Sequence, residues 1–122
     1  MVRKLQDQRT FSRTPGVDIS VLVEPSEMYN AGRLYARITI APGAAAAYHR
    51  HDNEMEVFYI TKGVCRMEDN DKTVYLTAGD VLITPENECH SIANDTDEPV
   101  ELVALIVSTK QGVEGTSVSV PQ

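Results

Sequence analysis

The stretch Gly43-Ala-Ala-Ala-Ala-Tyr-His49-Arg-His51-Asp-Asn-Glu-Met-Glu56-Val-Phe-Tyr-Ile-Thr-Lys-Gly63 decides how this chain is interpreted. In it, two histidines are separated by a single residue, and a glutamate follows five positions after the second. A later stretch, Gly79-Asp-Val-Leu-Ile-Thr-Pro85-Glu-Asn-Glu-Cys-His90-Ser-Ile-Ala-Asn94, contains the third histidine. Because the chain has only three histidines, every imidazole falls in this pattern, which indicates one shared use.

That use is most simply the binding of a metal ion. Side chains alternate along a β-strand, so His49 and His51 point to one face. Glu56 begins the next expected strand after a short turn, and His90 must come from a strand that lies alongside in the fold. Three imidazoles and one carboxylate leave two positions of an octahedron open. They suit Fe, Mn, Ni, Zn or Cu, so the sequence predicts one divalent transition-metal ion of unassigned identity. The alternatives are ordinary polar histidines, or a metal that performs no chemistry.

Outward from these motifs, short β-rich runs are separated by Gly, Pro, Asn and Asp, which predicts a single all-β domain. The expected strands are residues 17–23, 34–40, 48–51, 56–61, 64–68, 73–76, 81–84, 89–93 and 100–108. Residues 25–29 can form one turn of helix. The domain spans 1–122, with its core at about 15–110, a polar N-terminal arm at 1–12, and a weak strand or flexible tail at 111–122.

The two motifs resemble the paired signatures of the cupin superfamily, Gly-(x)5-His-x-His-(x)3–4-Glu-(x)6-Gly and Gly-(x)5-Pro-x-Gly-(x)2-His-(x)3-Asn. The resemblance covers residues 43–94 and, through the strand pattern, most of the chain. It is that of a small single-domain cupin of the conserved-barrel type. It implies a double-stranded β-helix, or jelly roll, with the metal inside one mouth of the barrel. The implied metal ligands are His49, His51, Glu56 and His90. The middle glycine of the second motif is Asn87 here, and asparagine tolerates left-handed backbone.

Two positions near the motif leave alternatives open. Glu54 competes with Glu56 for the carboxylate ligand; the six-residue spacing to Gly63 selects Glu56, and we expect Glu54 to lie solvated in a turn. Strand parity from Glu56 places Phe58 inside and Tyr59 outside. Phe58 is then either a wall of the pocket or part of the core.

The strand 34–40 and the residue before it offer a polar face. Its two faces are Leu34, Ala36, Ile38 and Ile40 on one side, and Arg33, Tyr35, Arg37 and Thr39 on the other. The polar face could line the pocket, with Arg37 holding a substrate carboxylate through a bidentate pair, or it could face solvent. Arg37 and Phe58 are therefore the pocket candidates, and no catalytic residue is assigned.

Composition excludes some classes of partner. The net charge of −7 and the pI near 4.8 argue against nucleic acid, because phosphate binding needs clustered Lys and Arg. No apolar run approaches the ~20 residues that cross a bilayer. The first residues lack the apolar stretch of a signal peptide. Two cysteines, Cys65 and Cys89, are typical of reduced thiols. We therefore predict a cytoplasmic protein.

The leading hypothesis is a mononuclear metalloenzyme that acts on a small oxygen-rich metabolite, of the dioxygenase, isomerase, decarboxylase or lyase type. The alternative is a non-catalytic module that binds or senses a sugar or an organic acid with the help of the metal. The resemblance to small cupins also implies a homodimer, built through exchanged N-terminal strands and the outer face of one sheet. Residues 1–12 and the outward Tyr59 would fit that arrangement.

Overall fold

A computed structural model describes residues 1–122, and nearly all its regular structure is β. The strands are β1 (Thr10–Thr14), β2 (Val17–Val23), β3 (Gly32–Ile40), β4 (His49–Asp52), β5 (Glu54–Lys62), β6 (Cys65–Asp69), β7 (Lys72–Leu76), β8 (Val81–Thr84), β9 (Cys89–Ala93), β10 (Val100–Ser108) and β11 (Thr116–Ser119). Two short 3-10 turns, η1 (Leu5–Asp7) and η2 (Pro25–Met28), are the only helical elements. Neither has the length or apolar character that a membrane-spanning helix requires.

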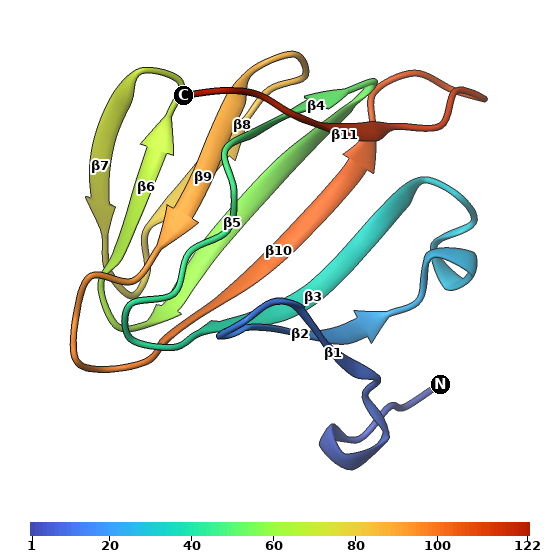
Figure 1. Cartoon of the computed structure of the whole chain (residues 1–122). Coiled ribbons are helices and arrows are strands. Elements are labelled where there is room, and N and C mark those ends of the chain that lie inside the picture. The colour runs from blue at the N-terminus through green and yellow to red at the C-terminus, as the bar shows by residue number, and fades with distance from the viewer.

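The strands form two antiparallel sheets that face each other (Figure 1). One sheet has the order β1-β2-β3-β10-β5-β8, and the other has the order β11-β4-β9-β6-β7. Strands far apart in sequence are neighbours, as where β10 lies between β3 and β5. This arrangement is the jelly roll that the sequence predicts.

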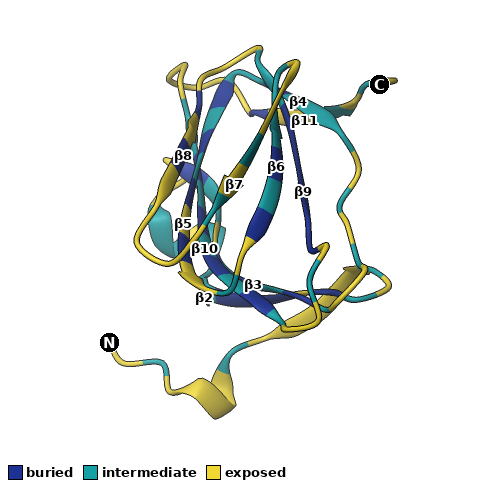
Figure 2. Ribbon diagram, turned by 90° about the vertical axis from the view of Figure 1, so that its left-hand side faces the viewer, coloured by how far each residue is buried: buried dark blue, intermediate teal, exposed yellow.

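The core fills the space between the sheets, where inward-facing apolar residues of β2, β3, β5, β6, β8, β9 and β10 are buried (Figure 2). β10 shows the alternation most clearly: Val100, Leu102, Ala104 and Ile106 are all buried, while the residues between them are half-exposed. Period-two alternation is the pattern of strands that have one face on a core and one face outward. The hydrophobic effect therefore fixes the register of each strand, since a slip by one residue would exchange the two faces.

The nine expected strands are all present, and four of them have the expected bounds: β2, β8, β9 and β10. Two more strands are present: β1 begins in the segment described as an arm and extends to Thr14, and β11 lies in 111–122, where a weak strand or a flexible tail was expected. β1 pairs with β2 at one edge of the larger sheet, and β11 pairs with β4 at one edge of the smaller sheet. Asn87 has a φ of 68°, so it takes the left-handed backbone expected of a residue that replaces glycine.

Candidate metal centre

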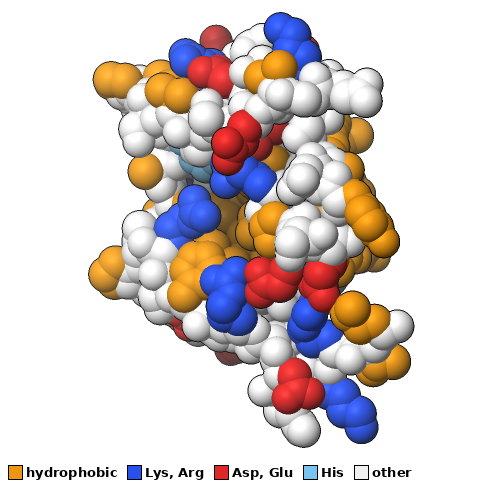
Figure 3. Space-filling model, turned by 90° about the vertical axis from the view of Figure 1, so that its right-hand side faces the viewer, with side chains coloured by type: hydrophobic (Ala, Val, Ile, Leu, Met, Phe, Trp, Pro, Cys, Tyr) orange, Lys and Arg blue, Asp and Glu red, His pale blue; other side chains and the backbone are white.

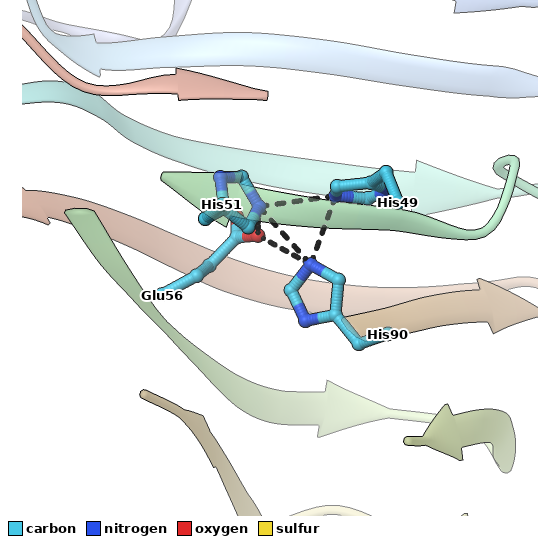
Figure 4. A group of neighbouring side chains, drawn as sticks. All are labelled: His49, His51, Glu56 and His90. Carbon is cyan, nitrogen blue, oxygen red and sulfur yellow. Dashed lines mark hydrogen bonds and ion pairs between the residues drawn. The ribbon is translucent and has the colours of Figure 1, made fainter. Parts of the chain in front are cut away.

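The side chains of the four predicted ligands come together and point toward one another (Figure 4). His49 and His51 share an inward face of β4, and His90 lies on β9 directly opposite His49 in the antiparallel register. Glu56 comes from β5 and so belongs to the other sheet. One ligand atom from each residue lies within 4.8 Å of the others. The fold therefore assembles the site from three strands and both layers.

The side chains point at a common centre. The Nε2 atoms of His49 and His90 are 2.9 Å apart, those of His49 and His51 are 3.0 Å apart, and those of His51 and His90 are 3.2 Å apart. The Oε1 atom of Glu56 lies 2.9 Å from Nε2 of His51 and 2.9 Å from Nε2 of His90. Three nitrogens and one oxygen thus converge, as a divalent ion requires.

The opposite edge of each imidazole is anchored. His49 donates from Nδ1 to the carbonyl oxygen of Ala47 at 2.7 Å, and His51 donates from Nδ1 to Glu54 at 2.6 Å. Nδ1 of His90 is hydrogen-bonded to the hydroxyl of Thr84 at 2.8 Å. Outer hydrogen bonds of this kind fix the ring orientation and direct Nε2 toward a metal. The residues therefore fit a cation bound by three Nε2 atoms and a carboxylate.

The electrostatics of the cluster also suit a cation. Burial of Glu56 opposes its charge, but hydrogen bonds from His51 and His90 outweigh that effect and lower its pKa to about 2. Burial lowers the pKa of His49 to about 4, so its imidazole is neutral at pH 7. Burial also opposes the charge of His51, but bonds to Glu56 and Glu54 prevail and raise its pKa. The ligands must be deprotonated to hold a metal ion, so binding at this cluster would compete with protons.

The prediction that Glu54 lies solvated in a turn is wrong. Its residue exposure is 1%, and it begins β5 rather than lying in a loop. Its carboxylate forms an ion pair with Arg33 at 2.6 Å and accepts a hydrogen bond from Nδ1 of His51. Sequence parity with Glu56 places both glutamates on the inner face, and a buried carboxylate is tolerated because it is fully paired.

A cavity of about 40 Å³ adjoins the ligands. Figure 3 shows the surface hollowed on this side, with a histidine visible inside and basic side chains beside the opening. Its walls are mostly apolar, and Arg13 and Arg33 supply its cationic groups. Phe58 forms one wall and stacks on the ring of His90, with centroids 5.0 Å apart. Phe58 therefore borders the cavity and also belongs to the core.

Arg37 does not line this cavity. It lies on the outer face of β3, where its guanidinium is 3.8 Å from the carboxylate of Glu101 on β10. The outward alternative for Arg37 is thus the one the structure shows. The sequence placed Arg33 on the polar face that could line the pocket but did not select it as a candidate; in the structure Arg33 sits beside an irregularity in β3 and lines the cavity. Arg13, on the unexpected strand β1, was not considered.

Comparison with known proteins assigns the family. The family model described as Cupin domain (Cupin_2) matches residues 36–107. The chain is a cupin. It is 37% identical over 91 residues to a curated oxalate-binding protein of Thermotoga maritima, and the matched region covers 75% of each chain. A crystal structure described as a predicted oxalate decarboxylase from Thermotoga maritima superposes with a TM-score of 0.80 and 33% identity, covering 88% of this cupin and 99% of that chain. A sugar phosphate isomerase structure from Silicibacter pomeroyi has a TM-score of 0.77 at 17% identity, covers 89% of this cupin and 76% of that chain, and shows the fold alone.

Proposed function

We propose that this cupin binds a small dicarboxylate, of the oxalate class, at a divalent metal ion held by His49, His51, Glu56 and His90. The observation that carries the proposal is the cluster itself, in which four ligand atoms lie within 4.8 Å of one another beside a cavity with cationic groups. The relative named as an oxalate-binding protein, which is 37% identical, supports the choice of ligand class.

The size of the cavity favours a compact ligand. Its volume is about 40 Å³, while a single water molecule needs roughly 10–15 Å³ by the same kind of measure. The space therefore suits an anion of a few heavy atoms better than a sugar ring. Of the two ligand types in the binding hypothesis, the organic acid is the better match.

The charges in the cavity favour an anion. Arg13 and Arg33 face a site whose remaining walls are largely apolar. Charge-assisted hydrogen bonds are strong where water is partly excluded, and guanidinium groups match the geometry of carboxylates. A bound metal ion adds positive charge at the base of the same cavity. A dicarboxylate offers one anionic group to the ion and another to a guanidinium, whereas a neutral metabolite offers no anionic group to either.

A reaction on the bound ligand is the second candidate, and the open ligand set favours it. A divalent ion held by three imidazoles and a carboxylate supplies Lewis-acid chemistry through its remaining positions. The chain itself would contribute the guanidinium groups that orient a carboxylate, the hydroxyl of Ser91 in the cavity wall, and apolar walls such as Phe58 that exclude water.

The test is calorimetric titration with oxalate, using protein stripped by a chelator and protein reloaded with Mn, Fe, Co, Ni, Cu or Zn. We expect oxalate to bind only after reloading, and His90→Ala to lose both metal and oxalate. Arg37→Gln, which changes an outward side chain, serves as the matched control and keeps both. Equal affinity for oxalate with and without metal would refute the proposal. Release of formate and carbon dioxide from oxalate would assign turnover, and its absence with intact binding would assign a binding protein.

We also propose that the outer face of the larger sheet binds a second copy of the chain. Its adjoining outward apolar residues on β3, β10, β5 and β8 are Tyr35, Val57, Tyr59, Val81, Ile83, Val103 and Leu105. Ile83 is 60% exposed and Tyr59 is 46% exposed, and contiguous exposed apolar residues of this kind mark interaction sites.

Light scattering of the wild type and of Ile83→Asp tests this assembly. We expect a dimer that dissociates in the variant, with Tyr75→Asp on the other sheet as the control, since Tyr75 is equally exposed at 61%. A monomeric wild type at micromolar concentration would contradict it. The cytoplasmic location stays a prediction; Cys65 and Cys89 are both free thiols in the structure.

A further inference from the structure

Arg33 enters the cavity because of a β-bulge. Along the pairing of β3 with β10, Leu34 faces Ile106 and Gly32 faces Val107, so Arg33 is an extra residue without a partner of its own. A bulge of this kind interrupts the alternation of side chains and re-aims one of them. The result is that Arg33 and Leu34, although adjacent, both line the cavity. Regular alternation would have placed only one of them there.

Gly32 permits this bulge. A Cβ atom at this position would collide with the carbonyl oxygen of Ile106, so a larger residue would force β3 away from β10. The glycine and the extra residue form one feature of the strand, and that feature brings a guanidinium to the metal cavity.

The guanidinium of Arg33 is held on one side only. Its Nε donates to Oε2 of Glu54 at 2.8 Å, and its Nη2 donates to Oε1 at 2.6 Å. Its Nη1 makes no hydrogen bond within the protein. The same Oε1 atom of Glu54 accepts a hydrogen bond from Nδ1 of His51 at 2.6 Å. One buried carboxylate therefore links the cavity arginine to a predicted metal ligand, and leaves donors of the arginine available to a ligand.

We propose that Arg33 is the specificity residue that receives a carboxylate of the bound dicarboxylate, and that Glu54 is the positioning residue that fixes both Arg33 and His51. This inference rests on the proposed function. A dicarboxylate has one anionic group for the ion and a second for the guanidinium, whereas a monocarboxylate has only one. Arg33 therefore discriminates between the two ligand types. A purely structural role, in which Arg33 only neutralises the charge of Glu54, would affect both ligands alike.

The experiment compares Arg33→Gln, Arg33→Lys, Glu54→Gln and the matched control Arg37→Gln. Each variant is stripped and reloaded with Mn²⁺, its Mn²⁺ affinity is measured by competition with a chelator, and oxalate and acetate are titrated calorimetrically. Circular dichroism confirms folding, and Arg33→Lys provides a second test if Arg33→Gln is unstable. Arg37→Gln shares the strand and the chemical change, but its side chain faces outward.

We expect Arg33→Gln to weaken oxalate binding about 10- to 100-fold, the range for a lost charge-assisted bond. Acetate and Mn²⁺ affinities should change little. Arg33→Lys should be intermediate, since it keeps the charge but not the planar fork. Glu54→Gln should weaken Mn²⁺ affinity about 10- to 100-fold, as loss of an outer partner of a metal ligand does. Arg37→Gln should match the wild type throughout.

Two failures are distinguishable. If the wild type shows metal-dependent oxalate binding but Arg33→Gln binds oxalate equally well, or loses oxalate and acetate in the same proportion, the role of Arg33 is overturned and the proposed function stands. If the metal-loaded wild type binds no oxalate, the proposed function fails and the specificity role fails with it. An unchanged Mn²⁺ affinity in Glu54→Gln overturns the positioning role independently of any ligand.

Discussion

Metal loading should stabilise this cupin by an amount that the site and the chain length determine. The folded chain presents His49, His51, His90 and Glu56 with their ligand atoms within 4.8 Å of one another. The unfolded chain separates His90 from His51 by 39 positions, so it offers no comparable site. A metal ion that binds only the folded state raises the free energy of unfolding by mass action.

The size of the effect follows from that linkage. At a free metal concentration 100 times the dissociation constant, the gain is about 2.7 kcal/mol. Unfolding entropy near 60 °C is about 2.1 cal/mol/K per residue, which gives ~0.26 kcal/mol/K for a chain of this length. The midpoint of thermal unfolding should therefore rise by about 10 °C.

Differential scanning calorimetry with and without a chelator measures this rise, once the dissociation constant has been obtained for each metal. His90→Ala is the informative variant, because it removes one ligand. His90 is also fully buried and stacked on Phe58, so the metal-induced shift should be compared rather than the absolute midpoint. Arg37→Gln should keep the full rise. No rise with any of Mn, Fe, Co, Ni, Cu or Zn, or an undiminished rise in His90→Ala, would refute the reasoning.

Three further predictions concern the metal-free protein. The pKa of Glu56 is lowered from 4.5 to about 2, so the unfolded chain takes up its proton first. The free energy of unfolding should therefore fall by about 3 kcal/mol between pH 4.5 and pH 2. Urea unfolding at a series of pH values across this range measures it, and the fall should be smaller in Glu56→Gln. Gly115→Ala should lower the free energy of unfolding by about 1–3 kcal/mol, because a Cβ atom there would collide with Glu54. Thr116→Ala, at the exposed neighbouring position, is the control and should lower it by less than about 0.5 kcal/mol. Equal effects of the two variants would contradict the steric argument. Burial raises the pKa of the Cys65 thiol to about 11, so at pH 8 it should react with a thiol reagent only after denaturation. Rapid labelling of Cys65 itself in the native protein, as distinct from the half-exposed Cys89, would show that the core opens around Cys65.

The sequence predicted the parts of this molecule that depend on regular alternation. The strand pattern and the shared face of His49 and His51 depend only on side chains pointing to alternate faces, so an all-β fold with two histidines on one face follows from the sequence itself. The jelly roll and the full set of ligands were expected from the resemblance to cupins. The same parity correctly placed Phe58 inside and Tyr59 outside.

The parts that could not be predicted depend on exceptions to that rule. A bulge at Arg33 exists only through the pairing of β3 with β10, and no local pattern distinguishes Arg33 from Arg37. β1 lacks an apolar alternation, because it is an edge strand with mostly exposed side chains. β11 is similarly exposed, and there the sequence left a weak strand and a flexible tail as alternatives. Glu54 itself obeys the alternation, since it has the parity of Glu56, but no local pattern reveals its pairing with Arg33, 21 positions earlier in the chain. Each missed feature is therefore a product of tertiary contact.

The division of the ligands between the two layers has a mechanical meaning. Three imidazoles belong to one sheet and the carboxylate of Glu56 belongs to the other, so an ion would act as a clasp across the seam of the sandwich. The far end is closed by Ile40 and Val100, which are fully buried, roughly 20 Å away along β10 at the usual rise per residue. A bound ion would then limit how far the two sheets separate near the ligands, while the packing at the closed end would be unaffected. Amide hydrogen exchange on β4 and β9 should slow on loading, and exchange at the closed end should not change.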